Sequence, residues 1–469
     1  MLLSSRNQHT WEVRTMEVVF EIRDGNEYLS SHSGLALVGT LLNRTDLKNR
    51  LNGVDLSCCS DPSIVHSDVV YAMLGLLCLG KPDFDAIEPF RADTFFGQAM
   101  GMGRCPSSST LRQRLDVVDN AFDTILKEES ADLVCQMAPK ITPVVTSTGK
   151  FVPLDLDVSP FDNSKTKKEG VSWTYKGFDG FSPIFSYVGK EGYLVNAELR
   201  EGKQHCQNDT PAFLRDSIRY AGRVTNQNLL VRMDSGNDSL ENVKICIEEK
   251  VQWLIKRNLR KEDKQQWLDL AKREGTKTCP RQGKAIWRGC TYRKVAGIEK
   301  PLQIVFEVTE RTITAKGQIL IFPEIEVDTY WASLECPAYE NILLYHDHGE
   351  SEQFHSELKS DMDLERLPSK HFATNALVLL MGMLAYNILR ICGQESVRED
   401  NGTVEKRPGY RRKAQRRRIR TVMQDLIYMA GRIISHSRKW FLSFGRFAPW
   451  AMVWRSLYQR FSQPSVQGG

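Results

Sequence analysis

The order of secondary-structure patterns between residues 151 and 258 most strongly constrains what this chain can fold into. The run FVPLDLDV (151–158) alternates in the manner of a strand, and two more strand patterns follow it, separated by Gly-rich turns. Helical and strand-like patterns then alternate: a helix at 210–222, a strand at 228–236, a helix at 238–250 and a strand at 251–258. Three strands in a meander, then strands alternating with helices, predict an α/β sheet whose later strands are parallel.

This order matches a ribonuclease H-like catalytic core. Helix-spaced apolar residues dominate the region before the core. Within the core, a charged helical segment followed by three strand patterns forms an insertion. The predicted regions are an N-terminal extension (1–29), a helical domain (30–140), the catalytic core (146–262 and 340–395), a β-rich insertion (263–339) and a basic, helical C-terminal region (396–469).

Composition excludes several other classes of protein. The 469 residues are 41% hydrophobic and 26% charged, which suits a soluble chain of two or three domains. The eleven cysteines form no CxxC pair, so a structural zinc site and a disulfide framework are both disfavoured, and a reducing cytoplasm fits best. The sequence contains no P-loop, which disfavours an ATP-driven helicase or recombination motor. It contains no GxSxG motif, so a serine nucleophile of the hydrolase type is not supported.

No segment predicts a membrane protein. The longest apolar run, Ala376 to Tyr386, is too short to cross a bilayer, and we expect it to form a buried helix. The N-terminus lacks the charged-then-apolar pattern of a signal peptide. The first fifteen residues are polar, and Met16 is an alternative start.

Two acidic residues stand on strands of the predicted core. Asp157 shares the polar face of the first strand with Asp155, and Asp234 ends a predicted parallel strand, where function concentrates in open α/β sheets. Carboxylates are the ligands that Mg²⁺ prefers. We favour Asp157 over Asp155, partly on the resemblance described below; the alternative for Asp234 is a plain turn residue. Asp238 is read as a helix N-cap, with Glu241 three residues on.

Four polar residues late in the chain share a helical spacing. Tyr345, His348, Glu352 and Lys359 lie three, four and seven residues apart, which places them on one face of a helix. Glu352 is the candidate third metal ligand. Lys359, Tyr345 and a protonated His348 are candidate contacts to a DNA phosphate. The alternative is a set of surface polar residues without a common role.

Basic residues concentrate in the C-terminal region. From Thr403 to Lys439 there are twelve Lys or Arg residues against two acids. Such a block is typical of a polyanion contact or, alternatively, of a solvated tail. Arg412, Arg416, Arg417 and Arg418 are the candidate DNA contacts.

The helical domain also offers a candidate DNA contact. The stretch 106–126 begins with serines suited to capping and continues at helical spacing, with Thr110, Arg112 and Arg114 near its start. It predicts either the recognition helix of a helix-turn-helix or an ordinary amphipathic helix. Trp287 and Trp331, in the insertion, either stack on an extruded base or pack in the core.

The motif YHDHGESEQFHSELK, from Tyr345 to Lys359, resembles the Tyr-x2-Arg-x3-Glu-x6-Lys motif of DDE transposases of bacterial insertion sequences, with His348 in the place of Arg. The runs LDLDVS, RMDSG, ELK-x6-RLPS and FATNALVLLMGMLAYNIL are most similar to insertion-sequence family 1380. The resemblance covers about residues 30 to 440.

The resemblance implies a ribonuclease H-like fold and a catalytic triad of Asp157, Asp234 and Glu352. These residues would bind two Mg²⁺ ions, for which Mn²⁺ can substitute, and catalyse endonuclease cleavage and strand transfer. The expected partners are double-stranded DNA, namely terminal inverted repeats and target DNA, and a second copy of the chain when bound to the ends. The expected location is the cytoplasm, associated with the nucleoid, with no membrane partner.

Two alternatives stay open. A ribonuclease H-like nuclease or resolvase would cut without strand transfer, and an inactive DNA-binding regulator would not cut at all. The presence of all three acids favours an active enzyme.

Overall fold

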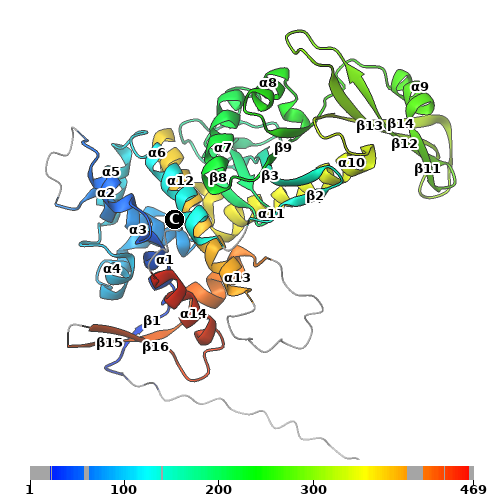
Figure 1. The fold of residues 1–469 in the computed structure, drawn as a ribbon. Helices are drawn as coiled ribbons and strands as arrows, with labels where there is room; N and C mark the ends of the chain where they lie inside the picture. The colour runs from blue at the N-terminus through cyan, green and yellow to red at the C-terminus, as the bar shows by residue number, and fades with distance from the viewer. Residues whose placement is uncertain are drawn as a thin grey trace, which may run out of the picture.

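The computed structural model describes residue 22 and residues 24–56, 63–138, 141–398, 416–437 and 439–463. Helices from the first third of the chain lie at one end of the molecule together with the C-terminal elements (Figure 1). A mixed sheet occupies the middle, and long paired strands extend from it at the opposite end. The helix α12 (Phe372–Ser396) runs between the helical end and the sheet.

Five strands form the centre of the sheet in the order β8-β7-β3-β9-β10. β3 pairs antiparallel with β7, and β7 antiparallel with β8, as in a meander. β3 pairs parallel with β9, and β9 parallel with β10. The helices α7 (Thr210–Val224) and α8 (Leu240–Glu248) make the two crossovers. The strands are β3 (Gly149–Val158), β7 (Ile184–Val188), β8 (Tyr193–Glu198), β9 (Leu229–Met233) and β10 (Gln252–Lys256).

The β-rich insertion continues this sheet and does not form a sheet of its own. β14 (Ile319–Ala332) pairs antiparallel with β10, so one ten-stranded sheet runs through both regions. Beyond β14 lie the helix α9 and three further strands; a short strand, β2 (Val144–Thr146), pairs β3. These elements are α9 (Lys264–Glu274), β11 (Thr276–Arg281), β12 (Lys284–Arg293) and β13 (Leu302–Ile313).

Both candidate tryptophans of the insertion pack inside the protein. Trp287 and Trp331 are each 5% exposed, which confirms the core-packing alternative. The indole of Trp331 donates a hydrogen bond to Asp238 at 3.0 Å. The N-cap of α8 is Ser239, whose hydroxyl accepts from the Glu241 amide, so the prediction that Asp238 is the cap is wrong by one residue.

The first third of the described chain is helical. Its longer helices pack against α12, which contacts α3, α6 and the strand β8. The helices are α1 (Leu35–Leu42), α2 (Leu47–Asn52), α3 (His66–Cys78), a 3-10 helix (Phe84–Phe90), α4 (Thr94–Met100), α5 (Ser108–Asp116) and α6 (Asp123–Met137).

The stretch read as one candidate recognition helix is two helices, α5 and α6. Ser107 caps α5 by accepting from the Thr110 amide, as the serine pattern predicts. Arg114 is engaged inside the domain, because it donates to the Ile64 carbonyl and contacts His66 at 2.8 Å each. The Arg114 side chain therefore joins α5 to the start of α3 within the domain.

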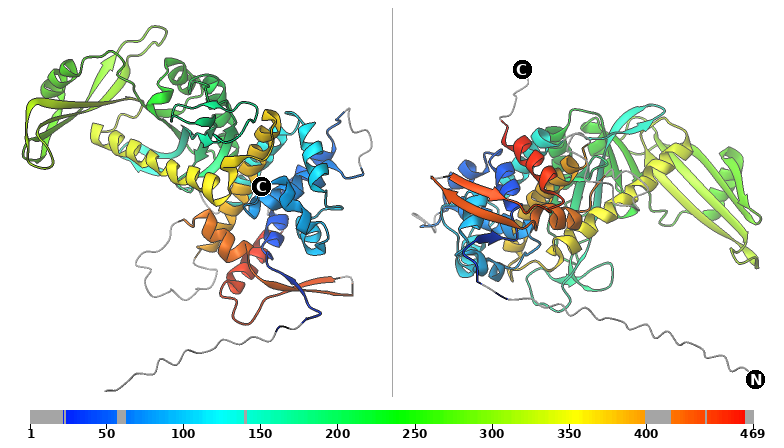
Figure 2. Two further views of the ribbon diagram at one scale, coloured as in Figure 1. Left: turned by 180° about the vertical axis from the view of Figure 1, so that it is seen from behind. Right: turned by 90° about the horizontal axis from the view of Figure 1, so that it is seen from below.

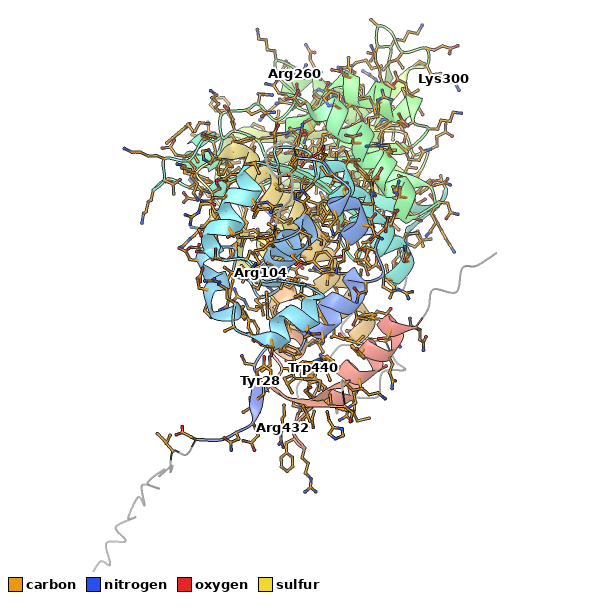
Figure 3. All side chains as sticks on the ribbon, turned by 90° about the vertical axis from the view of Figure 1, so that its left-hand side faces the viewer. Tyr28, Arg104, Arg260, Lys300, Arg432 and Trp440 are labelled. Atoms are coloured by element: carbon orange, nitrogen blue, oxygen red, sulfur yellow. The ribbon has the colours of Figure 1, made fainter. Side chains whose placement is uncertain are left out.

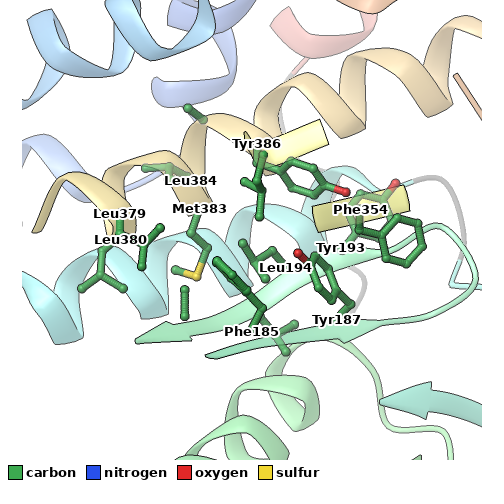
Figure 4. Packing of buried hydrophobic residues seen from close by; sticks show 14 of the residues in the cluster. Phe185, Tyr187, Tyr193, Leu194, Phe354, Leu379, Leu380, Met383, Leu384 and Tyr386 are labelled. Atoms are coloured by element: carbon green, nitrogen blue, oxygen red, sulfur yellow. The ribbon is translucent and has the colours of Figure 1, made fainter. Parts of the chain in front are cut away.

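The helix α12 is the only described helix that is long and apolar enough to cross a membrane, and 94% of its most apolar window is buried inside the protein. That burial identifies it as a core helix. It packs one side against the helical end and the other against the sheet, where Met383 and Tyr386 meet strands β7 and β8 (Figure 4).

The sequence patterns predict a helical C-terminal region, but the structure shows strands there as well as helices. Two of its strands form a small sheet with β1 (Tyr28–Ser30), in the order β1-β15-β16, so segments from both ends of the described chain lie side by side (Figure 2). The C-terminal elements are α13 (Ile419–Val422), β15 (Gly431–His436), β16 (Lys439–Ser443) and α14 (Ala451–Ser462).

Candidate active site

Two of the predicted acids meet at the carboxyl ends of neighbouring parallel strands. Leu156 of β3 is in register with Met233 of β9, so the residues that follow, Asp157 and Asp234, stand next to each other at the edge of the sheet. Few donors satisfy them. Asp157 Oδ1 accepts from the Val158 amide at 2.8 Å, and Asp234 Oδ1 accepts from the Asn237 side chain at 2.8 Å.

The neighbouring acid Asp155 has a different environment. It is 2% exposed and accepts two hydrogen bonds from Arg232, at 2.6 and 2.7 Å. His348 Nδ1 lies 3.0 Å from Asp155 Oδ1, and Arg232 also donates to the Leu344 carbonyl. These cations hold the pKa of Asp155 below its usual range although burial opposes them. Asp155 therefore serves as an internal anchor, which supports the choice of Asp157 as the candidate ligand.

Asp157 is a half-buried acid that no basic side chain among the described residues neutralises at hydrogen-bonding distance. Burial raises its pKa to about 7; the nearby His348 opposes this rise and the charge of Asp234 adds to it. A cation between the two aspartates would remove this penalty. Oxygen donors of this kind suit a hard divalent ion.

The segment with Tyr345, His348, Glu352 and Lys359 is not one regular helix. It runs through α10 (Ala338–His346), a 3-10 turn, α11 (Ser351–Ser356) and a π-helical turn (Glu357–Asp361). Phe354 anchors α11 by packing against Tyr187 of β7, with ring centroids 5.1 Å apart (Figure 4). The change of helix type alters which side chains point outward, and spacing alone could not predict it.

The predicted residues nevertheless line one cleft, whose volume is about 870 Å³. Glu352 is exposed at its wall and lies in the same cleft as both aspartates. The predicted residues that line the cleft are Asp157, Asp234, Glu352, Tyr345, His348 and Lys359.

Three candidate phosphate contacts have internal partners as well. His348 is 6% exposed, and the Asp155 carboxylate raises its pKa against the effect of burial. Lys359 Nζ donates to the Pro160 carbonyl at 2.5 Å, and burial lowers its pKa to about 8. The Tyr345 ring packs 4.8 Å from Tyr330. The burial of His348 disfavours, for this residue, the alternative of a set of surface polar residues, and all three side chains are positioned by contacts within the protein.

Among the cleft-lining residues that the sequence analysis did not single out, three carry ionisable groups near Asp157. His355 is buried, lies 3.7 Å from Asp157 and has a pKa that burial lowers to about 3, so its imidazole is neutral. Tyr175 and Lys176 lie in the turn between β5 (Ser172–Trp173) and β6 (Asp179–Phe181) and line the same cleft as α11. The position of His355, three residues after Glu352, was a usable signal. The sequence around Tyr175 and Lys176 contains no pattern that would have marked them as cleft residues.

The predicted DNA-binding arginines pair with acids of the protein itself. Arg416 donates to both oxygens of Glu357 at 3.0 Å, and Arg418 donates to both oxygens of Asp361 at 2.8 and 3.0 Å. Arg417, 7% exposed, pairs with Asp425. For these three arginines the contacts disfavour the alternative of a solvated tail, and they leave the predicted DNA contact as a prediction. Arg412 lies outside the described residues.

The metal-binding prediction fits the residues in part. Within the described part of the chain, no three His, Cys, Asp or Glu side chains stand close enough together to hold an ion as they are. The adjacent, under-satisfied pair Asp157 and Asp234 fits a hard cation by donor chemistry and by charge. Glu352 would have to approach that pair to complete the predicted set.

Comparison with known proteins gives the family. The family model for transposase DDE domain group 1 matches residues 13–466. The chain belongs to this family. No curated protein matches it. A solved structure, the cryo-EM structure of a piggyBac transposase synaptic complex with hairpin DNA, is similar over 93% of this chain and 83% of that chain, with a TM-score of 0.41 and 11% identity. So distant a likeness assigns no residue a role.

Membership of the DDE transposase family gives the acids of the cleft a chemical context. Enzymes of this family generally use divalent metal ions, and acids held at the end of parallel strands are suitable ligands. The family assignment agrees with the resemblance drawn from the Tyr345–Lys359 motif at the level of DDE transposases.

Proposed function

We propose that this DDE transposase binds terminal inverted repeats and catalyses metal-dependent cleavage and strand transfer of an insertion sequence, with Asp157, Asp234 and Glu352 as its catalytic acids. The observation that carries the proposal is the adjacent pair Asp157 and Asp234 in a cleft that also holds Glu352. The strand order β8-β7-β3-β9-β10 supports a ribonuclease H-like core. Membership of insertion-sequence family 1380 is part of the proposal.

The three acids would hold two Mg²⁺ ions, which supply Lewis-acid activation of the attacking oxygen and charge neutralisation at the phosphate. The other residues of the cleft orient the DNA. His348, held by Asp155, presents the rest of its imidazole ring toward the cleft, and Lys359 adds a positive charge at its rim. The neutral His355 packs beside Asp157 and fixes that side of the cleft.

The testing experiment is a cleavage and strand-transfer assay on the element's own end DNA with Mg²⁺. Asp157→Asn, Asp234→Asn and Glu352→Gln are each expected to remove both activities while DNA binding is retained. Asp347→Asn is the matched control, because this exposed acid belongs to the same segment and does not line the cleft.

Two outcomes would replace the proposal. Cutting without joining would indicate a nuclease or resolvase. Binding of end DNA without cutting in Mg²⁺ or Mn²⁺ would indicate a DNA-binding regulator. Assembly as a dimer on the ends is measured in the same samples by light scattering.

A further inference from the structure

The C-terminal end of the chain has an unusual charge distribution. From Leu426 to Gly469 the sequence contains no Asp or Glu at all. It contains six basic residues, Arg432, Arg438, Lys439, Arg446, Arg455 and Arg460. Among the described ones, Arg460 pairs with Glu395. The side chains of Arg432, Lys439, Arg446 and Arg455 are exposed and form no ion pair with a described residue.

The small sheet presents two of these cations on one face. Arg432 stands in register between Leu29 and Ser443, and His436 stands opposite Lys439. Because alternate residues of a strand point to the same side, Arg432, His436 and Lys439 share a face.

Apolar residues on the same face complete the surface. Ile434 pairs with Phe441 between the two cationic rows, and Leu29, Ile434 and Phe441 are 68%, 38% and 49% exposed. Ile433, on the opposite face, is 6% exposed and packs toward the protein. The face of Arg432 is therefore the solvent side of the sheet. Figure 3 shows Arg432 and Trp440 at the end of the molecule opposite Arg260 and Lys300.

The contrast with the preceding arginines decides which residues are available to a partner. Arg416, Arg418 and Arg420 are taken up by Glu357 and Asp361. No described acid takes up Arg432 or Lys439. Asp24 and Glu27, just before β1, form no ion pair with a described residue.

We propose that this sheet face, defined by Leu29, Arg432, Ile434, His436, Lys439 and Phe441, binds the phosphate backbone of duplex DNA. The inference rests on the proposed function and adds a second contact surface to it, apart from the catalytic cleft. Arg and Lys side chains that form no ion pair with a described acid attract phosphates, and exposed aliphatic and aromatic side chains between them pack against sugar. A second copy fits less well, since it would bring like charges together across the interface.

The test measures duplex binding as a function of salt. The probe is a fluorescein-labelled duplex of unrelated sequence, followed by anisotropy, with wild type and with the double variant Arg432→Gln, Lys439→Gln. Losing two phosphate contacts should raise the Kd about tenfold near physiological salt. It should also reduce the salt slope, which is the slope of the logarithm of the binding constant against the logarithm of the salt concentration, by about two. Arg432→Lys with Lys439→Arg keeps the charges and should restore both values.

The matched control removes two exposed lysines, Lys294→Gln and Lys300→Gln, from the loop between β12 and β13. It changes the net charge equally and should leave the slope unchanged. An unchanged Kd and slope in the sheet variant would overturn the inference, as would a change of oligomeric state with unchanged DNA binding. Cleavage of end DNA by wild type is run alongside, so that failure of the proposed function itself is seen separately.

Discussion

The segment from Ser351 to Asp361 carries acids on two sides, and the protein surrounds the two sides in opposite ways. On the cleft side, Glu352 accepts no hydrogen bond from a described residue, and it lines the same cleft as Asp157 and Asp234, which accept few hydrogen bonds. On the other side, Glu357 and Asp361 are buried and receive arginines from α12 and from the stretch 416–420.

The partners of Glu357 show how complete that second arrangement is. Arg390 and Arg416 both donate to its carboxylate, the Tyr386 hydroxyl lies at 3.3 Å and the Ile419 amide at 3.4 Å. A buried charge with this many donors has its desolvation cost offset, whereas a buried charge without them destabilises the fold. Residue type alone therefore does not separate a structural acid from a candidate catalytic one. The set of donors around it does.

The largest expected effect comes from replacing one acid on each side of this segment and comparing the two variants. Glu357→Gln leaves Arg390 and Arg416 without a buried counter-charge and should lower the free energy of unfolding by about 3 kcal/mol. Glu352→Gln removes an exposed side chain and should change it by less than about 0.5 kcal/mol while abolishing DNA cleavage. Urea unfolding and the cleavage assay measure the two properties. Equal stability losses in the two variants would show that the two sides are not different.

The aspartates of β3 should respond with opposite signs. Asp155→Asn removes the partner of the buried Arg232 and is expected to cost about 3 kcal/mol. Asp157→Asn removes an acid that burial penalises, and should raise the free energy of unfolding by about 2 kcal/mol at pH 7 with divalent ions chelated. Thermal and urea unfolding in EDTA provide the measurement. A loss of stability in Asp157→Asn would mean that its carboxylate is better satisfied than its hydrogen bonds indicate.

Much of the core was predictable because its signals are local. The alternation of FVPLDLDV and the apolar runs at 210–258 predict β3, α7, β9, α8 and β10, and these elements form with the expected parallel pairing. Asp234 was predicted from the rule that functional side chains collect where parallel strands end, whereas the choice of Asp157 over Asp155 rested partly on the family resemblance.

The misses concern contacts between segments distant in sequence. Nothing local shows that Arg416 and Arg418 meet Glu357 and Asp361, about sixty residues earlier, or that His348 turns inward to Asp155. A 3.6-residue period also assumes one regular helix, and the 3-10 and π-helical turns at 347–361 depart from it. The small β1-β15-β16 sheet unites residues from both ends of the chain, which no window of sequence covers.

A pH titration sharpens the contrast on β3. The unfolded chain releases the Asp157 proton near pH 4, and the folded chain near pH 7. Between these values the folded state binds more protons, so the Asp157 contribution to stability falls as pH rises. The stability difference between Asp157→Asn and wild type in EDTA should therefore be small near pH 4, grow toward pH 7 and level off above it. A difference that shrinks with rising pH would contradict the direction of this shift.

The smallest expected effect decides between two roles for Arg418. Its side chain is 50% exposed and shares Asp361 with Arg420, so Arg418→Gln should lower the free energy of unfolding by only about 0.5 kcal/mol. If its role is to hold the π-helical turn, the salt slope for duplex binding stays at the wild-type value. A slope reduced by about one would instead identify a phosphate contact, and Asp361 would then be an anchor that DNA displaces. Because the stability loss is small, the altered slope would reflect binding and not unfolding.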